Sequence, residues 1–196
     1  MSENEHGGLR TAAALKPGAL KKTIVMVGMM GAGKTAVGRA LAARLGVPFL
    51  DSDHEIENAA NMSIPEIFAR DGEAFFRQKE RQVIARLLAE ERGVLSTGGG
   101  AFLAEENREI VRAAGVSVWL KADLEVLWNR VRHRDTRPLL RTADPKATLE
   151  ALYRARVPLY AKADLAVVSD GQASIETMVD RVLEALTARP DVLEWQ

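Results

Sequence analysis

The stretch GMMGAGKT, residues 28–35, decides the fold of this 196-residue chain. It meets every fixed position of the phosphate-loop pattern G-x-x-x-x-G-K-[ST], and it directly follows the apolar run 23–27. Glycines let backbone N–H groups point inward without a Cβ in the way, so such a loop can cradle phosphate oxygens where a helix begins. The pattern predicts a site for a nucleoside triphosphate. The alternative is a glycine turn that only joins a strand to a helix.

Within this loop the residue types suit a nucleotide and a metal ion. Lys34 would reach the outer phosphates, and the Thr35 hydroxyl would ligate Mg²⁺, which prefers a few oxygen ligands together with phosphates. A helix should follow, because apolar residues recur at Val37, Leu41 and Leu45 before Gly46. We expect the nucleotide to contact Gly31, Ala32, Gly33, Lys34, Thr35 and Ala36.

Composition limits what kind of protein this is. With 47% hydrophobic residues the chain can bury one core, which predicts a single domain over 23–188, a flexible N-terminal extension over 1–22 and a tail over 189–196. Lys+Arg and Asp+Glu balance at 27 each, so no overall electrostatic field favours binding to nucleic acid or anionic lipid.

There is no cysteine, which excludes disulfides and thiolate chemistry. No long apolar stretch opens the chain. We expect a cytoplasmic monomer that binds neither membranes nor nucleic acid.

Short apolar runs alternate with longer helical patterns along the chain. The runs lack clean polar alternation, as expected for strands covered on both faces. This alternation predicts an α/β fold with a parallel sheet between helices, and ligands beyond the carboxyl ends of the strands. The expected strands cover 23–27, 48–50, 94–96, 117–120 and 165–168.

Two carboxylates, Asp51 and Asp53, follow the second expected strand in the sequence DSD. Beside a nucleotide site this pair suggests metal and substrate binding. The third expected strand ends in STGGG without an acidic residue, so Asp51 is the candidate for orienting the metal's waters. Asp53 is then left for the substrate. The alternative is that Asp53 only caps the helix that begins at His54.

Three glycines in a row, Gly98, Gly99 and Gly100, follow the third expected strand. They suit a place where the main chain approaches a ligand closely or takes a positive φ. A loose turn is the alternative.

Residues 130–141, RVRHRDTRPLLR, concentrate positive charge in a chain whose net charge is zero. Arginine forks bind phosphate and carboxylate oxygens in bidentate fashion. Beside a triphosphate the segment reads as a mobile lid, at about 130–147, that closes on the transferred group. A solvated basic helix end is the alternative. Two further arginines, Arg77 and Arg156, lie outside this segment. Without other motifs beside them, each would be read as a surface charge.

Six motifs in order, GMMGAGKT, FLDSDHEIE, FFRQKE, STGGGA, RPLL and RxPLYxxA, resemble the shikimate kinase family over about residues 23–170. The resemblance implies the fold shared with nucleoside monophosphate kinases, in which a five-stranded parallel sheet has the order 2-3-1-4-5. It also implies ATP-dependent phosphorylation of the 3-hydroxyl of shikimate, with Mg²⁺, in aromatic amino acid biosynthesis.

The resemblance assigns roles residue by residue. Catalytic roles fall on Asp53, Lys34 and the lid residue Arg137. Arg130 matches a position near the adenine. Thr35 and Asp51 match residues of the family's magnesium environment. Substrate contacts fall on Asp53, Arg77, Gly98, Gly99, Gly100 and Arg156.

Other functions fit the motifs less well. A gluconate or nucleoside monophosphate kinase shares the fold, but the combination of DSD, FFR, the glycine triplet and RPLL points to the shikimate group. A GTPase switch should carry an NKxD motif, which does not occur here. A nucleic-acid module would need a basic face with aromatic platforms, whereas aromatic residues make up only 5% of this chain.

Overall fold

A five-stranded parallel sheet forms the centre of the computed structural model, which describes residues 16–134 and 140–196. Across the sheet the order is β3-β4-β2-β5-β6. Because β2 is the first of these strands along the chain, this is the predicted order 2-3-1-4-5, which is confirmed. The strands are β2 Thr23–Val27, β3 Phe49–Asp51, β4 Val94–Ser96, β5 Gly115–Lys121 and β6 Leu165–Val168.

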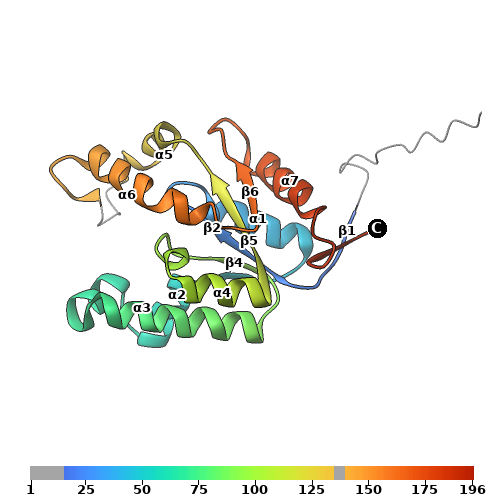
Figure 1. The fold of residues 1–196 in the computed structure, drawn as a ribbon, viewed down its shortest axis with the longest axis horizontal. Helices are drawn as coiled ribbons and strands as arrows, with labels where there is room; N and C mark the ends of the chain where they lie inside the picture. Colours follow the sequence, from blue (N-terminus) through green and yellow to red (C-terminus); the bar gives the residue numbers. More distant parts are fainter. Residues whose placement is uncertain (1–15, 135–139) are drawn as a thin grey trace, which may run out of the picture.

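Helices cover both faces of the sheet, as Figure 1 shows. The helices α1 (Lys34–Leu45) and α7 (Ile175–Leu186) pack on each other on one side, and α3 (Ile64–Glu90) and α4 (Glu105–Ala114) do so on the other. All five residues of β2 are buried between these layers, which explains their unbroken apolar run. Further helices are α2 Ser52–Ala60, the 3₁₀ helix η2 Ala101–Leu103, α5 Leu124–Val131 and α6 Pro145–Tyr160.

Local signals in the sequence set several helix ends. Gly46 takes the left-handed conformation that ends α1, at φ 65° and ψ 34°. Ser63 and Glu66 form a reciprocal capping box at the start of α3. Helix α3 then breaks its regular geometry at Gly72, where φ is 84° and ψ is 172°. The break separates the capped first turns from the long segment that carries Arg77.

Two strands that the sequence analysis missed lie at the ends of the described chain. β1 (Pro17–Leu20) and β7 (Leu193–Trp195) pair antiparallel in a separate two-stranded sheet. We expected residues 1–22 and 189–196 to lie outside the folded domain, yet this pairing gives parts of both segments regular structure. Each strand is too short for its hydrophobic pattern to predict a strand from the sequence. Each is instead stabilised by pairing with the other. In the described ranges, no helix is both long and apolar enough to cross a membrane.

Candidate active site

The phosphate loop joins β2 to α1 in a conformation that needs its glycines. Gly28, Gly31 and Gly33 have φ values of 146°, 82° and 97°, a region that side chains rarely allow. Helix α1 begins at Lys34, so the backbone N–H groups of its first turn have no partner within the helix. This geometry offers an anion site at the helix N-terminus, where a polyphosphate would fit.

Lys34 is held over the loop that it belongs to. Its Nζ donates hydrogen bonds to the carbonyl oxygens of Gly28, at 2.7 Å, and Met29, at 3.0 Å. The ammonium group therefore stays at the mouth of the loop as a positioned point charge.

A cavity of about 810 Å³ opens beside the phosphate loop at the carboxyl ends of the strands. Most of the predicted site residues line it: Gly31, Ala32, Gly33, Lys34, Thr35, Ala36, Asp51, Asp53, Gly98, Gly99 and Arg130. Gly100, Arg77 and Arg156 are not among its lining residues, but they adjoin it through the glycine triplet. The prediction for Arg137 lies outside the described residues.

Asp51 caps helix α2 and faces the same cavity as Thr35. Its Oδ1 accepts hydrogen bonds from the backbone N–H groups of Asp53, at 3.0 Å, and His54, at 3.2 Å. The cap that the sequence analysis weighed for Asp53 therefore belongs to Asp51, and Asp53 keeps its carboxylate for other partners. Over residues 16–134 and 140–196, no three His, Cys, Asp or Glu side chains gather closely enough to cage a metal. A hydroxyl, a carboxylate, phosphates and waters are a donor set that suits Mg²⁺.

Asp53 has the perturbed acidity expected of a group that handles protons. Burial, followed by the negative charges of Asp51 and Glu80, raises the pKa of Asp53 to about 6, and Lys34 opposes this shift. At neutral pH this carboxylate is mostly ionised, yet it is a stronger base than an exposed aspartate.

Each glycine of the triplet lies against one polar side chain of the predicted substrate site. A Cβ placed on Gly98 would lie 2.9 Å from Asp53 Oδ1, and a Cβ on Gly99 would lie 2.9 Å from Arg156 Nη1. On Gly100 it would lie 2.5 Å from Arg77 Nη2. None of the three glycines has a positive φ. Glycine is needed here for close approach, which the sequence analysis offered as one of its possibilities.

Arg77 is oriented by a carboxylate on its own helix. Its Nη1 donates to Glu80 Oε1 at 2.9 Å, and Glu80 is only 1% exposed. Burial raises the pKa of Glu80, while the charge of Arg77 lowers it. Glu80 thus holds Nη1 of Arg77, and both Nη1 and Nη2 lie close to the position that a Cβ on Gly100 would take.

Arg156 is buried on α6, with only 8% of its surface exposed. One helical turn later, Tyr160 donates a hydrogen bond from its Oη to the carbonyl oxygen of Gly99, at 2.5 Å. Two guanidinium groups from different helices, on Arg77 and Arg156, therefore meet the same glycine loop. Such a pair can hold one carboxylate from two sides.

Arg130 links the phosphate loop to the loop after β6. It donates from Nη1 to the carbonyl oxygen of Gly31, at 2.9 Å, and from Nη2 to Ser169 Oγ, at 3.1 Å. Arg130 lines the nucleotide side of the cavity together with Ser169. Its predicted place near the adenine stays a prediction.

Three residues of this arrangement were missed by the sequence analysis. Glu80 could have been found, because it stands three positions after Arg77 and so shares its helix face. Tyr160 stood in a quoted motif, but nothing in the spacing indicates a partner in a glycine loop 61 positions away. Ser169 lies in the loop over 169–173, whose sequence is too weakly patterned for an assignment of single residues.

Comparison with known proteins agrees with this geometry. The sequence model of the family described as shikimate kinase matches residues 30–187. A shikimate kinase of Ruegeria pomeroyi is 73% identical to this chain over 194 residues, which cover 99% of each chain. A shikimate kinase of Cereibacter sphaeroides is 70% identical over 175 residues, which cover 89% of this chain and 87% of the other. A solved structure, the shikimate kinase of Acinetobacter baumannii in complex with shikimate, has a TM-score of 0.80 at 39% identity and covers 85% of this chain and 93% of its own.

These matches span the phosphate loop, the glycine triplet and both arginines. Shikimate kinases use ATP with Mg²⁺, so the nucleotide and metal predicted from the loop are those of the family. The chain belongs to the shikimate kinase family and is an ATP-dependent kinase.

Proposed function

We propose that this chain transfers the γ-phosphoryl group of Mg-ATP to the 3-hydroxyl of shikimate, giving shikimate 3-phosphate and ADP, and that the residues around the glycine triplet bind the acceptor. One observation carries the proposal. Three consecutive glycines each lie against one polar side chain, an acid on Gly98 and guanidinium groups on Gly99 and Gly100. Shikimate has a carboxylate at one end and hydroxyls at the other, which is the complementary arrangement. The solved relative carries the same ligand.

The arginines would hold the acid end of shikimate. Arg77 comes from α3 and Arg156 from α6, so a carboxylate between them closes a bridge between two helices. Guanidinium forks match carboxylate oxygens in bidentate fashion, which fixes the orientation of the ring as well as its position. Gly98, Gly99 and Gly100 leave room for the ring to approach the backbone.

Asp53 would align and deprotonate the hydroxyl that is phosphorylated. The alcohol oxygen forms a bond to the γ-phosphorus, the bond from that phosphorus to the β–γ bridging oxygen breaks, and the hydroxyl proton passes to the Asp53 carboxylate. With a pKa of about 6, this carboxylate is charged at neutral pH and still accepts a proton more readily than an ordinary aspartate.

The phosphate loop and its cations would stabilise the transferred group. The loop residues from Gly31 to Ala36 supply backbone donors, and Lys34 supplies a positive charge held at the loop. Thr35 and Asp51 would hold Mg²⁺ with phosphate and water oxygens. When bound, the ion neutralises charge that develops on the phosphates. Arg137 is proposed as the arginine that completes this set from a lid at about 130–147.

The unit of function is proposed to be the single chain. The acid, the two guanidinium groups and the glycine triplet proposed to bind the acceptor come together within one chain, which supports this proposal. A domain over 23–188 and a cytoplasmic location stay predictions.

The test is a coupled ADP-release assay over a panel of acceptors that contains shikimate, gluconate and nucleoside monophosphates. Gluconate also has a carboxylate and hydroxyls, so it is the demanding comparison. Of the acceptors in the panel, we expect only shikimate to be turned over. ³¹P NMR of the product should show a phosphate monoester on the 3-oxygen. Faster turnover with gluconate or with a nucleotide acceptor would refute the proposal.

A further inference from the structure

Tyr160 ties the glycine triplet to helix α6. The side chain is completely buried, and its Oη donates to the carbonyl oxygen of Gly99 at 2.5 Å. The proposed reaction does not use this hydroxyl. A buried tyrosine hydroxyl usually has a partner, but this partner is the backbone of a proposed substrate loop, which gives the bond a consequence beyond packing.

The other carbonyls of the triplet are bonded inside their own loop. Gly98 accepts from the N–H of Ala101 at 3.1 Å, and Gly100 accepts from the N–H of Leu103 at 3.2 Å. The carbonyl of Gly99 instead meets a side chain from a helix that lies 61 positions further along the chain. Since glycines have no side chain to pack, this bond is what fixes the middle peptide against α6.

That single bond orients a donor as well as an acceptor. The described peptides are all trans, and in a trans peptide the C=O and the following N–H point in opposite directions. Holding the Gly99 carbonyl therefore also sets the direction of the Gly100 N–H. A rotation of this peptide would change the face that the loop presents to a bound ring.

Arg156 belongs to the same arrangement. It precedes Tyr160 by one helical turn, and a Cβ on Gly99 would lie 2.9 Å from Arg156 Nη1 and 3.6 Å from Tyr160 Oη. Burial raises the pKa of Tyr160, while the charge of Arg156 and its hydrogen bond to the phenol lower it. The phenol thus stays neutral and keeps the proton that it donates to Gly99.

We propose that Tyr160 is a positioning residue for the acceptor: its hydroxyl holds the Gly99 peptide, beside the Arg156 guanidinium, in the arrangement that binds shikimate. This inference rests on the proposed function. It predicts that loss of the hydroxyl weakens the binding of shikimate and not that of ATP. The hydrogen bond described for Tyr160 goes to the glycine triplet and not to the phosphate loop.

The test compares Tyr160→Phe with Tyr153→Phe, since these are the two tyrosines of the chain and both lie on α6. Each substitution removes one hydroxyl and keeps the ring. For Tyr160→Phe we expect the KM for shikimate to rise about tenfold, the effect of one lost hydrogen bond, with the KM for ATP unchanged. Tyr153→Phe should match the wild type in both constants. An unchanged shikimate KM in Tyr160→Phe, or an equal rise in both KM values, would overturn the inference.

A second measurement keeps the hydroxyl in place, in case Tyr160→Phe does not fold. In the Tyr153→Phe variant, Tyr160 is the single remaining tyrosine, so labelling with 3-fluorotyrosine gives one ¹⁹F resonance. We expect this resonance to shift as shikimate is titrated to saturation, and a resonance that does not move would refute the role. Failure of the proposed function would look different, because the wild type would then not phosphorylate shikimate at all.

Discussion

The carboxylate of Asp53 lies directly against the backbone of Gly98, so that a Cβ on this glycine would lie 2.9 Å from Oδ1 and 3.1 Å from Oδ2. The same relationship recurs between Gly100 and Arg77. The glycines have ordinary backbone angles, which alanine could adopt. Their small size is therefore what lets the polar side chains lie where they do, and this can be tested without disturbing the backbone.

Gly100→Ala should weaken shikimate binding. The added methyl group meets the tip of Arg77, which must move away and lose its place against the loop. We expect the KM for shikimate to rise about tenfold, with the KM for ATP unchanged. Steady-state kinetics measures both constants. Gly18→Ala, in β1, is the matched control, and an unaltered shikimate KM in Gly100→Ala would show that Arg77 does not need this space.

Asp53→Asn should lower turnover. The amide cannot accept the hydroxyl proton, and loss of a general base typically costs about 10² to 10⁴ in rate. The KM for ATP should change little, because Asp53 is not part of the phosphate loop. The control is Asp180→Asn, which changes an exposed carboxylate on α7. Near-normal kcat in the Asp53 variant would remove the proposed role.

The pH profile of kcat/KM for shikimate should rise with a midpoint near 6. The reaction needs the charged form of Asp53, whose pKa burial raises to about 6, so activity is lost as pH falls through that value. The measurement is the initial rate from pH 5 to pH 8 at saturating Mg-ATP. A rate that stays nearly flat from pH 8 down to pH 5, as an aspartate with the ordinary pKa near 4 would give, would mean that burial does not perturb this group.

Asp53→Asn should also stabilise the protein without ligands at pH above 6. The folded-state pKa of Asp53 lies above the unfolded value of 3.8, so the folded protein binds this proton more tightly. The charged carboxylate is therefore a cost that is fully present above pH 6 and disappears as pH falls toward 4. Urea unfolding at pH 7.5 and pH 4.5 should give a larger gain in the unfolding midpoint at the higher pH. A gain of equal size at both values would contradict the linkage.

Arg77→Ala should raise the KM for shikimate by about 10- to 100-fold, the effect of removing a charge-assisted hydrogen bond. Arg77→Lys should recover only part of this loss, because an ammonium group cannot bond both a carboxylate and Glu80 through a planar fork. Arg70→Ala, on the same helix but exposed, is the control. Full recovery by lysine would show that charge alone matters.

The parts of the fold that the sequence predicted are those with local causes. The phosphate loop needs glycines at particular φ values, and Gly46 and Ser63 end and begin helices through their own backbone and side chain. The strands 23–27, 94–96 and 165–168 were predicted with the bounds that the structure has. The order of the sheet came from the family resemblance, because no local pattern specifies which strands are neighbours.

The rest depends on contacts between distant segments. The spacing places Glu80 on the same helix face as Arg77, but its burial depends on distant segments, such as η2, that pack beside that helix. The cap of α2 is Asp51 and not Asp53, which the sequence could not decide, because two aspartates separated by one residue both fit the N-cap pattern. Pairing between β1 and β7 joins residues that are more than 170 positions apart, which periodicity in either segment cannot reveal.

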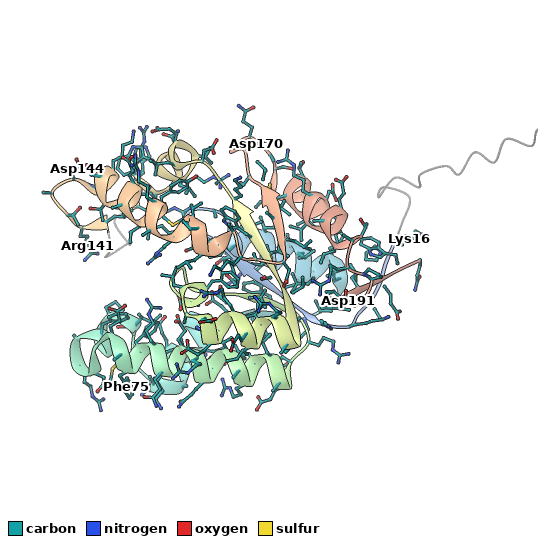
Figure 2. The ribbon with its side chains drawn as sticks, viewed as in Figure 1. Lys16, Phe75, Arg141, Asp144, Asp170 and Asp191 are labelled. Atoms are coloured by element: carbon teal, nitrogen blue, oxygen red, sulfur yellow. The ribbon has the colours of Figure 1, made fainter. Side chains whose placement is uncertain are left out.

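The pairing of β1 with β7 has a practical consequence for engineering. Lys16 and Gln196 exchange two backbone hydrogen bonds, of 3.0 and 2.9 Å, so the two ends of the strand pair are adjacent. Figure 2 places Lys16 and Asp191 at the end of the molecule opposite Arg141 and Asp144. A short peptide joining residue 196 to residue 16 would thus permit circular permutation, with new termini opened in a surface turn elsewhere.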